Sequence, residues 1–251
     1  MTVFATLPWG KVILADFRKT VTKPFFWLIL VMPLLIGWVL RYLLPYLNNR
    51  FIEQSANFIF ADYYPLILAL LILTPPIYYG FILALLLLEE KDEGVLSAVV
   101  VTPIRLPWFL SARIGLYTAI SLPLIYIVHE MIGVVAITPT RLLLIALAAA
   151  PAAPMISMLL TALCKNQLEG FVMGKGMGFL ILFPLAMFFV PDYWHLFCAI
   201  LPTYWPIIAY FTAVSEDGSS IFFNMAIVMS LLMQLTATLI LYRRFKRQLY
   251  S

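Results

Sequence analysis

Long apolar runs bounded by charged or turn-forming residues dominate the pattern along this chain. A helix needs about 20 apolar residues to cross the roughly 30 Å hydrocarbon core of a membrane, where its backbone hydrogen bonds must all be internal. The pattern therefore predicts an all-α membrane protein, a six-helix transmembrane bundle that forms a single domain over residues 1–251. The predicted spans are Phe25–Leu44, Tyr64–Leu88, Ile114–Val135, Leu142–Leu163, Met177–Val190 and Ile221–Tyr242.

Two further segments, residues 1–23 and 191–220, are too polar or too interrupted to be full spans. In the first, apolar residues recur every fourth position and charged residues avoid that row, which is typical of an amphipathic helix at the membrane interface. A plain basic flank that sets the orientation of the first span is the alternative. The second segment contains Pro202 and Pro206, and we expect it to be a re-entrant or loop segment on the outer side.

Composition and charge support a membrane protein and suggest its orientation. Hydrophobic residues make up 64% of the chain and charged residues only 11%, whereas soluble domains are near half apolar and a quarter charged. Of the 16 lysines and arginines, 13 fall on one side of the predicted membrane and three, Arg41, Arg50 and Arg141, on the other. Because basic residues stay preferentially in the cytoplasm, we expect cytoplasmic N- and C-termini in a cell (plasma) membrane. The net charge of +4 then reflects orientation and contact with membrane lipids, and it predicts no nucleic-acid partner.

Residues for catalysis or cofactor binding are few. His129-Glu130 begins like a metalloprotease H-E-x-x-H motif, but the second histidine is missing. The segment Gly170–Gly176 has the wrong glycine spacing for a phosphate-binding loop and no Ser or Thr after Lys175. We therefore expect no catalytic residue, bound cofactor or metal. His129 and Glu130 fall toward the outer end of a span, as an interfacial pair or, alternatively, as a proton relay.

Small and helix-loosening residues indicate how the spans pack. Gly170, Gly174 and Gly178 recur every fourth residue, which allows close helix packing within lipid or, alternatively, a flexible hinge before the fifth span. Proline lacks a backbone N–H and kinks or loosens a helix, which suits a bundle that must move. The prolines inside predicted spans are Pro33, Pro75, Pro76, Pro123, Pro151, Pro154 and Pro184.

The inner loop, residues 89–113, carries the most specific signal. Four of the twelve acidic residues lie within five positions, at Glu89, Glu90, Asp92 and Glu93, and a short apolar segment closed by Thr-Pro follows them. Acidic residues at the cytoplasmic end of a span contribute little to orientation. We therefore interpret the loop as a docking surface for a cytoplasmic partner; a solvated helix end followed by a loop is the alternative.

The run from Glu90 to Leu96, with Thr102-Pro103 after it, resembles the loop of ABC (ATP-binding-cassette) type-2 exporter permeases, and within them the small permeases of fluoroquinolone efflux. The resemblance implies a coupling helix in this loop that contacts a separate ATPase subunit, which binds ATP and Mg²⁺. Val95 stands where the family often has threonine. The resemblance also implies a second permease chain, in a homodimer or a heterodimer. The residues it places at the ATPase contact are Glu89, Glu90, Glu93, Gly94, Leu96, Thr102 and Pro103.

The expected function is that of a permease subunit of an ATP-driven exporter, which moves an amphipathic, drug-like or lipid-like substrate out of the cytoplasm. No substrate-binding residue is assigned. The alternative is a membrane-bound enzyme acting on a lipid-linked substrate, for which His129 and Glu130 would converge with Asp192 or His195 near the outer face. A third possibility is an assembly or immunity factor without transport.

Overall fold

The computed structural model describes residues 24–54, 59–96, 106–178, 195–215 and 219–250, which form helices and turns and contain no strand. The predicted all-α fold is thus confirmed for these parts of the chain. The predicted interfacial helix, residues 1–23, lies outside them. In chain order the helices are α2 (Pro24–Gln54), the 3₁₀ helix η2 (Phe60–Tyr63), α3 (Tyr64–Leu71), α4 (Thr74–Asp92), α6 (Leu106–Ile132), α7 (Pro139–Ala149), α8 (Ala152–Leu163), α9 (Gln167–Gly176), α11 (His195–Cys198), α12 (Tyr204–Val214) and α13 (Ser220–Tyr250).

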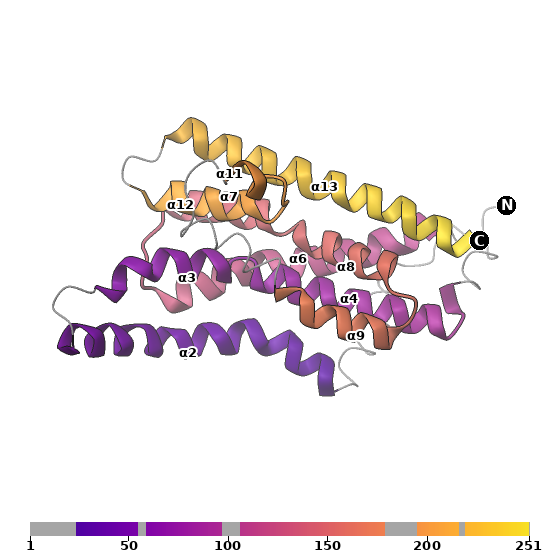
Figure 1. Cartoon of the computed structure of the whole chain (residues 1–251), viewed down its shortest axis with the longest axis horizontal. Helices are drawn as coiled ribbons and strands as arrows, with labels where there is room; N and C mark the ends of the chain where they lie inside the picture. The colour runs from indigo at the N-terminus through magenta and orange to yellow at the C-terminus, as the bar shows by residue number, and fades with distance from the viewer. Residues whose placement is uncertain (1–23, 55–58, 97–105, 179–194, 216–218, 251) are drawn as a thin grey trace.

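Five segments of the described residues are long and apolar enough to cross a membrane, and they lie side by side in a bundle (Figure 1). They overlap five of the six predicted spans. The remaining predicted span, Met177–Val190, lies outside the described residues except for its first two positions, so the count of six stays a prediction. The five segments are Phe26–Glu53, Phe60–Asp92, Pro107–Ile132, Pro139–Leu163 and Ser220–Gln248.

Two of the predicted spans are broken near their middle. The second is divided into α3 and α4, and the fourth into α7 and α8. Pro75 and Pro76 at the start of α4, and Pro151 before α8, each remove a backbone N–H that would bond to the preceding turn. Pro33 and Pro123 lie within continuous helices, so a proline alone does not determine where a span breaks.

The core lies between α4 and α8. Within the most apolar part of each span, 67% of the residues in Phe60–Asp92 are buried, compared with 22% in Phe26–Glu53 and 17% in Ser220–Gln248. A Cβ on Gly80 of α4 would overlap the backbone of Ala153 in α8, so these two helices meet backbone to backbone. The α2 and α13 segments instead turn large apolar side chains outward, as lipid-facing helices do.

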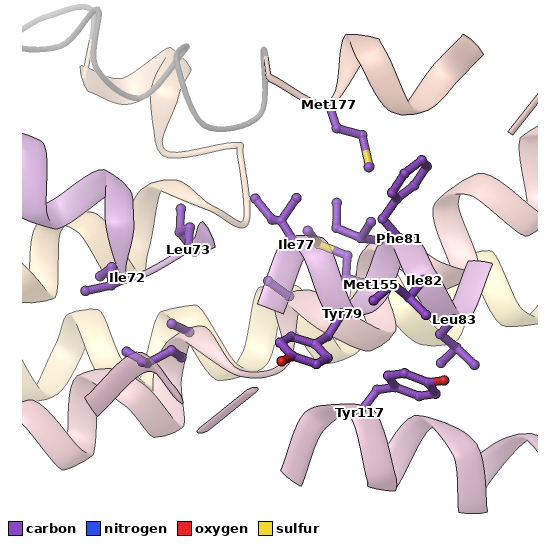
Figure 2. Packing of buried hydrophobic residues seen from close by; sticks show 14 of the residues in the cluster. Ile72, Leu73, Ile77, Tyr79, Phe81, Ile82, Leu83, Tyr117, Met155 and Met177 are labelled. Atoms are coloured by element: carbon purple, nitrogen blue, oxygen red, sulfur yellow. The ribbon is translucent and has the colours of Figure 1, made fainter. Parts of the chain in front are cut away.

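Figure 2 shows how side chains of α4 join this core to its neighbours. Phe81 points toward Met177, which follows α9, and Tyr79 lies on the side of α6, which carries Tyr117. The Tyr79 hydroxyl donates a hydrogen bond of 3.0 Å to the Leu30 carbonyl of α2. The shorter helix α12 packs on α3, α7 and α13. It lies within the predicted outer segment, residues 191–220, whose re-entrant path stays a prediction.

Helix ends that are far apart in sequence gather at one end of the bundle (Figure 1). There α4, α8 and α13 end and α6 and α9 begin, as hydrogen bonds and an ion pair between them confirm. Several helices extend beyond the predicted boundaries: α6 begins eight residues before the predicted span, and α13 continues to Tyr250. The α13 extension is rich in arginine, lysine and glutamine, which are good helix formers, so this helix does not stop where its apolar run stops.

Candidate functional site

The last turn of α4 carries four consecutive charged residues, Glu89 to Asp92, and they reach three neighbouring helices. Successive residues of an α-helix point about 100° apart, so adjacent charges can serve different partners. Glu90 faces α6, whereas Glu89, Lys91 and Asp92 face the turn between α8 and α9. We call these four residues, with Arg113, Cys164 and Gln167, the α4 junction.

A buried ion pair joins α4 to α6. The guanidinium of Arg113 makes a bidentate contact with Glu90, with Nη2 donating to Oε1 at 3.0 Å and Nη1 donating to Oε2. The exposed fractions of the two side chains are 0% and 6%. The Arg113 guanidinium also lies over the Phe109 ring, 4.9 Å from its centroid. Because the pair lies at the base of the predicted coupling loop, it fixes the spacing of the two helices that the loop connects.

Polar contacts also tie α4 to the α8–α9 turn. The backbone N–H of Gln167 donates to Asp92 Oδ2 at 2.9 Å, and its side-chain amide donates to Glu89 Oε2 at 3.3 Å. A carboxylate at the start of α9 is favourable because free N–H groups and the helix dipole meet it there. Lys91 donates to the Cys164 carbonyl at 3.3 Å, just after α8 ends, where a cation is favoured for the same reason. Burial raises the pKa of the Cys164 thiol, and Glu169 adds to the effect while Lys91 opposes it.

Beyond the α4 junction the chain makes an exposed turn. Glu93 ends α4 and is exposed, and Gly94 has a φ of +73°, a left-handed conformation that favours glycine. Val95 is 36% exposed, whereas Leu96 is fully buried. Thr102 and Pro103, the last two predicted contact residues, lie outside the described residues. The acidic cluster is therefore divided: Glu90 faces inward, Glu89 and Asp92 hold α9, and Glu93 projects outward.

The predicted glycine row lies partly along the contact between α4 and α9. A Cβ on Gly170 would come within 2.5 Å of Leu88, and one on Gly174 would overlap the Phe81 ring. Phe171 of α9 adds an edge-to-face contact with Phe81, with ring centroids 6.0 Å apart. Gly178 has open space around its Cβ position among the described residues. The first two glycines thus allow α9 to approach α4, and the third does not take part in that contact.

His129 and Glu130 do not form a cluster with other acidic or histidine side chains that the structure describes. The buried His129 shares a 3.0 Å hydrogen bond through Nε2 with the Tyr210 hydroxyl, which links α6 to α12. The Glu130 side chain is 52% exposed, with Oε1 3.6 Å from His129 Nδ1. Asp192 and the side chain of His195 lie outside the described residues. Within the described part of the chain no three metal-ligating residues come together. The arrangement is that of a contact between helices.

Arg113 and Gln167 were not recognised as partners of the acidic cluster from the sequence. The apolar pattern starts the third span at Ile114 and leaves Arg113 in the inner loop, whereas in the structure Arg113 lies two turns inside α6. A buried contact in α13 was missed as well: Ser230 and Gln234 both donate to the Ala148 carbonyl, at 2.8 and 2.9 Å, where α7 ends. Two polar residues four positions apart in an apolar span were a signal for such a contact.

Comparisons with known proteins agree with a transport role. The family model described as "Fluoroquinolones export permease protein Rv2686c-like" matches residues 16–242. Two proteins of Mycobacterium tuberculosis are each 30% identical over 243 residues, covering 92% of this chain and 91% of the relative. They are the fluoroquinolones export permease proteins MT2760 of strain CDC 1551 / Oshkosh and Rv2686c of strain H37Rv. No solved structure matches the chain.

Proposed function

Because this chain belongs to the Rv2686c-like family of fluoroquinolone export permeases, we propose that it is the membrane subunit of an exporter driven by a separate ATP-binding-cassette ATPase. Its relatives are named for the export of fluoroquinolones. The substrate we propose for this chain is accordingly an amphipathic, drug-like molecule that leaves the cytoplasm. The apolar and aromatic lining that its helices can provide suits such a molecule.

The observation that carries this proposal is the α4 junction. It is the firmly bonded base of an exposed turn, Glu93–Val95, which follows it directly. The Glu90–Arg113 pair links the base to α6, and the contacts of Gln167 link it to α9. A partner that pushes on the turn would therefore move several helices together, since the turn follows α4 directly. An ATPase can shift a bundle from one conformation to another only if its contacts with the bundle are more favourable in one conformation than in the other.

The remaining parts of the proposal concern topology and assembly. The ATPase would bind ATP and Mg²⁺, because this sequence has no phosphate-binding loop of its own. A second permease chain, identical or homologous, would complete the pore in the cell membrane. The end that carries the α4 junction would face the cytoplasm, and the termini are proposed to be cytoplasmic as well, in keeping with the 13 basic residues on that side of the predicted spans.

Co-purification with the ATPase tests this function. We expect Glu93→Lys to weaken binding of the ATPase because it reverses the exposed charge of the turn. Gly94→Pro should uncouple ATP turnover from transport, since proline cannot adopt the φ of +73° found here. Glu53→Lys, which changes an exposed carboxylate in the last turn of α2, is the matched control. Normal co-purification and normal coupling in both turn variants would refute the proposed contact.

A further inference from the structure

An open surface groove of about 590 Å³ runs along the last turns of α13. It is lined by Arg243, Arg244 and Arg247, together with Ile240 and Gln248. Three arginines thus surround a space that lies within the usual size range of small-molecule sites. None of the structural features described above uses this groove.

Contacts on the other side of α13 fix the direction in which the three arginines point. Phe245 is fully buried there, and at the edge of the groove Gln248 Nε2 donates to the Ala162 carbonyl of α8 at 3.0 Å. The arginines are therefore held outward, and all three are exposed. Among the described residues, no carboxylate forms an ion pair with any of them. Three positive charges on one face without counter-charges create a local field that attracts an anion.

The depth of the groove indicates where that anion comes from. The apolar run Ile221–Tyr242 has 22 residues and spans about 33 Å at 1.5 Å per residue, which is the thickness of the hydrocarbon core. Arg243 to Arg247 then extend roughly 2–8 Å further, and the headgroup layer on each side is about 5–7 Å thick. With α13 along the membrane normal, the guanidinium groups would therefore lie at the level of lipid phosphates, whereas a docked cytoplasmic protein would lie beyond that layer.

We propose that this groove binds the headgroup of an anionic phospholipid. Arginine binds phosphate oxygens with two parallel N–H donors, which favours it over lysine at such sites. The acyl chains would run along Leu235, Leu239 and Ile240, which are 49–61% exposed on α13 below the arginines. The polar groove and the apolar strip are continuous through Ile240, so one lipid molecule fits both.

Lipid titration of the full-length chain tests this site. The chain is purified in a neutral detergent and titrated with phosphatidylglycerol or phosphatidylcholine of identical acyl chains, and native mass spectrometry counts the retained lipid. Each basic residue near a membrane surface contributes about fivefold to the affinity for anionic lipid. We therefore expect the triple variant R243Q/R244Q/R247Q to lose about 100-fold of its affinity for phosphatidylglycerol. Its binding of phosphatidylcholine should not change.

The control variant is Arg50→Gln, which removes an exposed arginine near the end of α2 that already pairs with Glu53. It should retain phosphatidylglycerol like the wild type. If the triple variant does not insert, the single variants R243Q and R247Q should each lose about fivefold. Equal retention of the two lipids by the wild type would overturn the proposal. The proposal would also be overturned if inorganic phosphate displaced phosphatidylglycerol from the wild type as well as the lipid itself does. The same holds if the arginine variants retained phosphatidylglycerol but no longer bound the ATPase.

Discussion

Replacing Arg113 with alanine should destabilise the bundle more than any change to an exposed charge. The substitution leaves the Glu90 carboxylate, of which only 6% is exposed, without its cationic partner. Removing one member of a buried ion pair costs about 3–5 kcal/mol, because the remaining charge stays in a medium that does not solvate it. The contact with Phe109 is lost as well, which adds to the cost.

Thermal unfolding in detergent measures this effect. For a chain of this length, 1 kcal/mol shifts the midpoint by about 2–4 °C, so Arg113→Ala should lower it by roughly 10 °C. Glu90→Met with Arg113→Met replaces the whole pair by apolar side chains of similar length. This double variant should recover most of the loss, because apolar replacement of a buried pair is often neutral or stabilising.

The comparison can fail in two clear ways. If Arg113→Ala shifts the midpoint no more than Arg50→Ala, whose ion pair with Glu53 is more than half exposed, the pair between α4 and α6 is not buried in the membrane-bound protein. If the losses from the single Glu90 and Arg113 variants simply add in the double variant, the two residues do not interact energetically. Either result would also remove the link through which the α4 junction is proposed to move α6.

Three further predictions concern the other contacts of the core. Gly174→Leu should lower the free energy of unfolding by about 1–3 kcal/mol relative to Gly176→Leu, because only a side chain at position 174 would overlap the Phe81 ring of α4. Unfolding in denaturant compares the two variants, and equal stability would contradict close packing of α9 on α4. Gln234→Leu should cost about 0.6–2 kcal/mol because it removes one of the two donors, Ser230 and Gln234, to the buried Ala148 carbonyl of α7; an unchanged melting midpoint would count against that bond. Asp92→Asn should weaken the contact between α4 and the start of α9 and thereby speed maleimide labelling of the buried Cys164. Mass spectrometry of a variant without the other cysteine measures the labelling rate. An unchanged rate would mean that this contact does not protect Cys164.

Apolar run length alone was enough to locate most of the described membrane segments. Crossing a bilayer requires an apolar, largely helical stretch long enough to span the hydrocarbon core, and no tertiary partner is needed to recognise such a stretch. The breaks within spans were less predictable. Pro75, Pro76 and Pro151 lie where helices are divided, whereas Pro33 and Pro123 lie within continuous helices. A proline leaves a carbonyl group of the preceding turn without its N–H donor, and the neighbouring helices determine whether another donor is available.

The candidate site was predicted only in part. The unusual charge density after the second span singled out Glu89 to Glu93 as a functional segment, and the same pattern led to the exporter family. The sequence did not show which of these residues face inward. Glu90 and Glu93 are three positions apart and chemically identical, yet one is paired inside the bundle and the other is exposed. That difference depends on Arg113 of another helix.

Local properties of the chain thus determined the membrane location, the helical class and the position of the loop that we propose to contact the ATPase. These follow from hydrophobicity, charge and backbone chemistry along one continuous stretch of chain, without any contribution from other helices. Only the tertiary structure decided the partners: Arg113 for Glu90, the start of α9 for Asp92, and the outward direction of the arginines on α13. Pairing between helices depends on their rotation and depth in the bundle, and packing across the whole core fixes both.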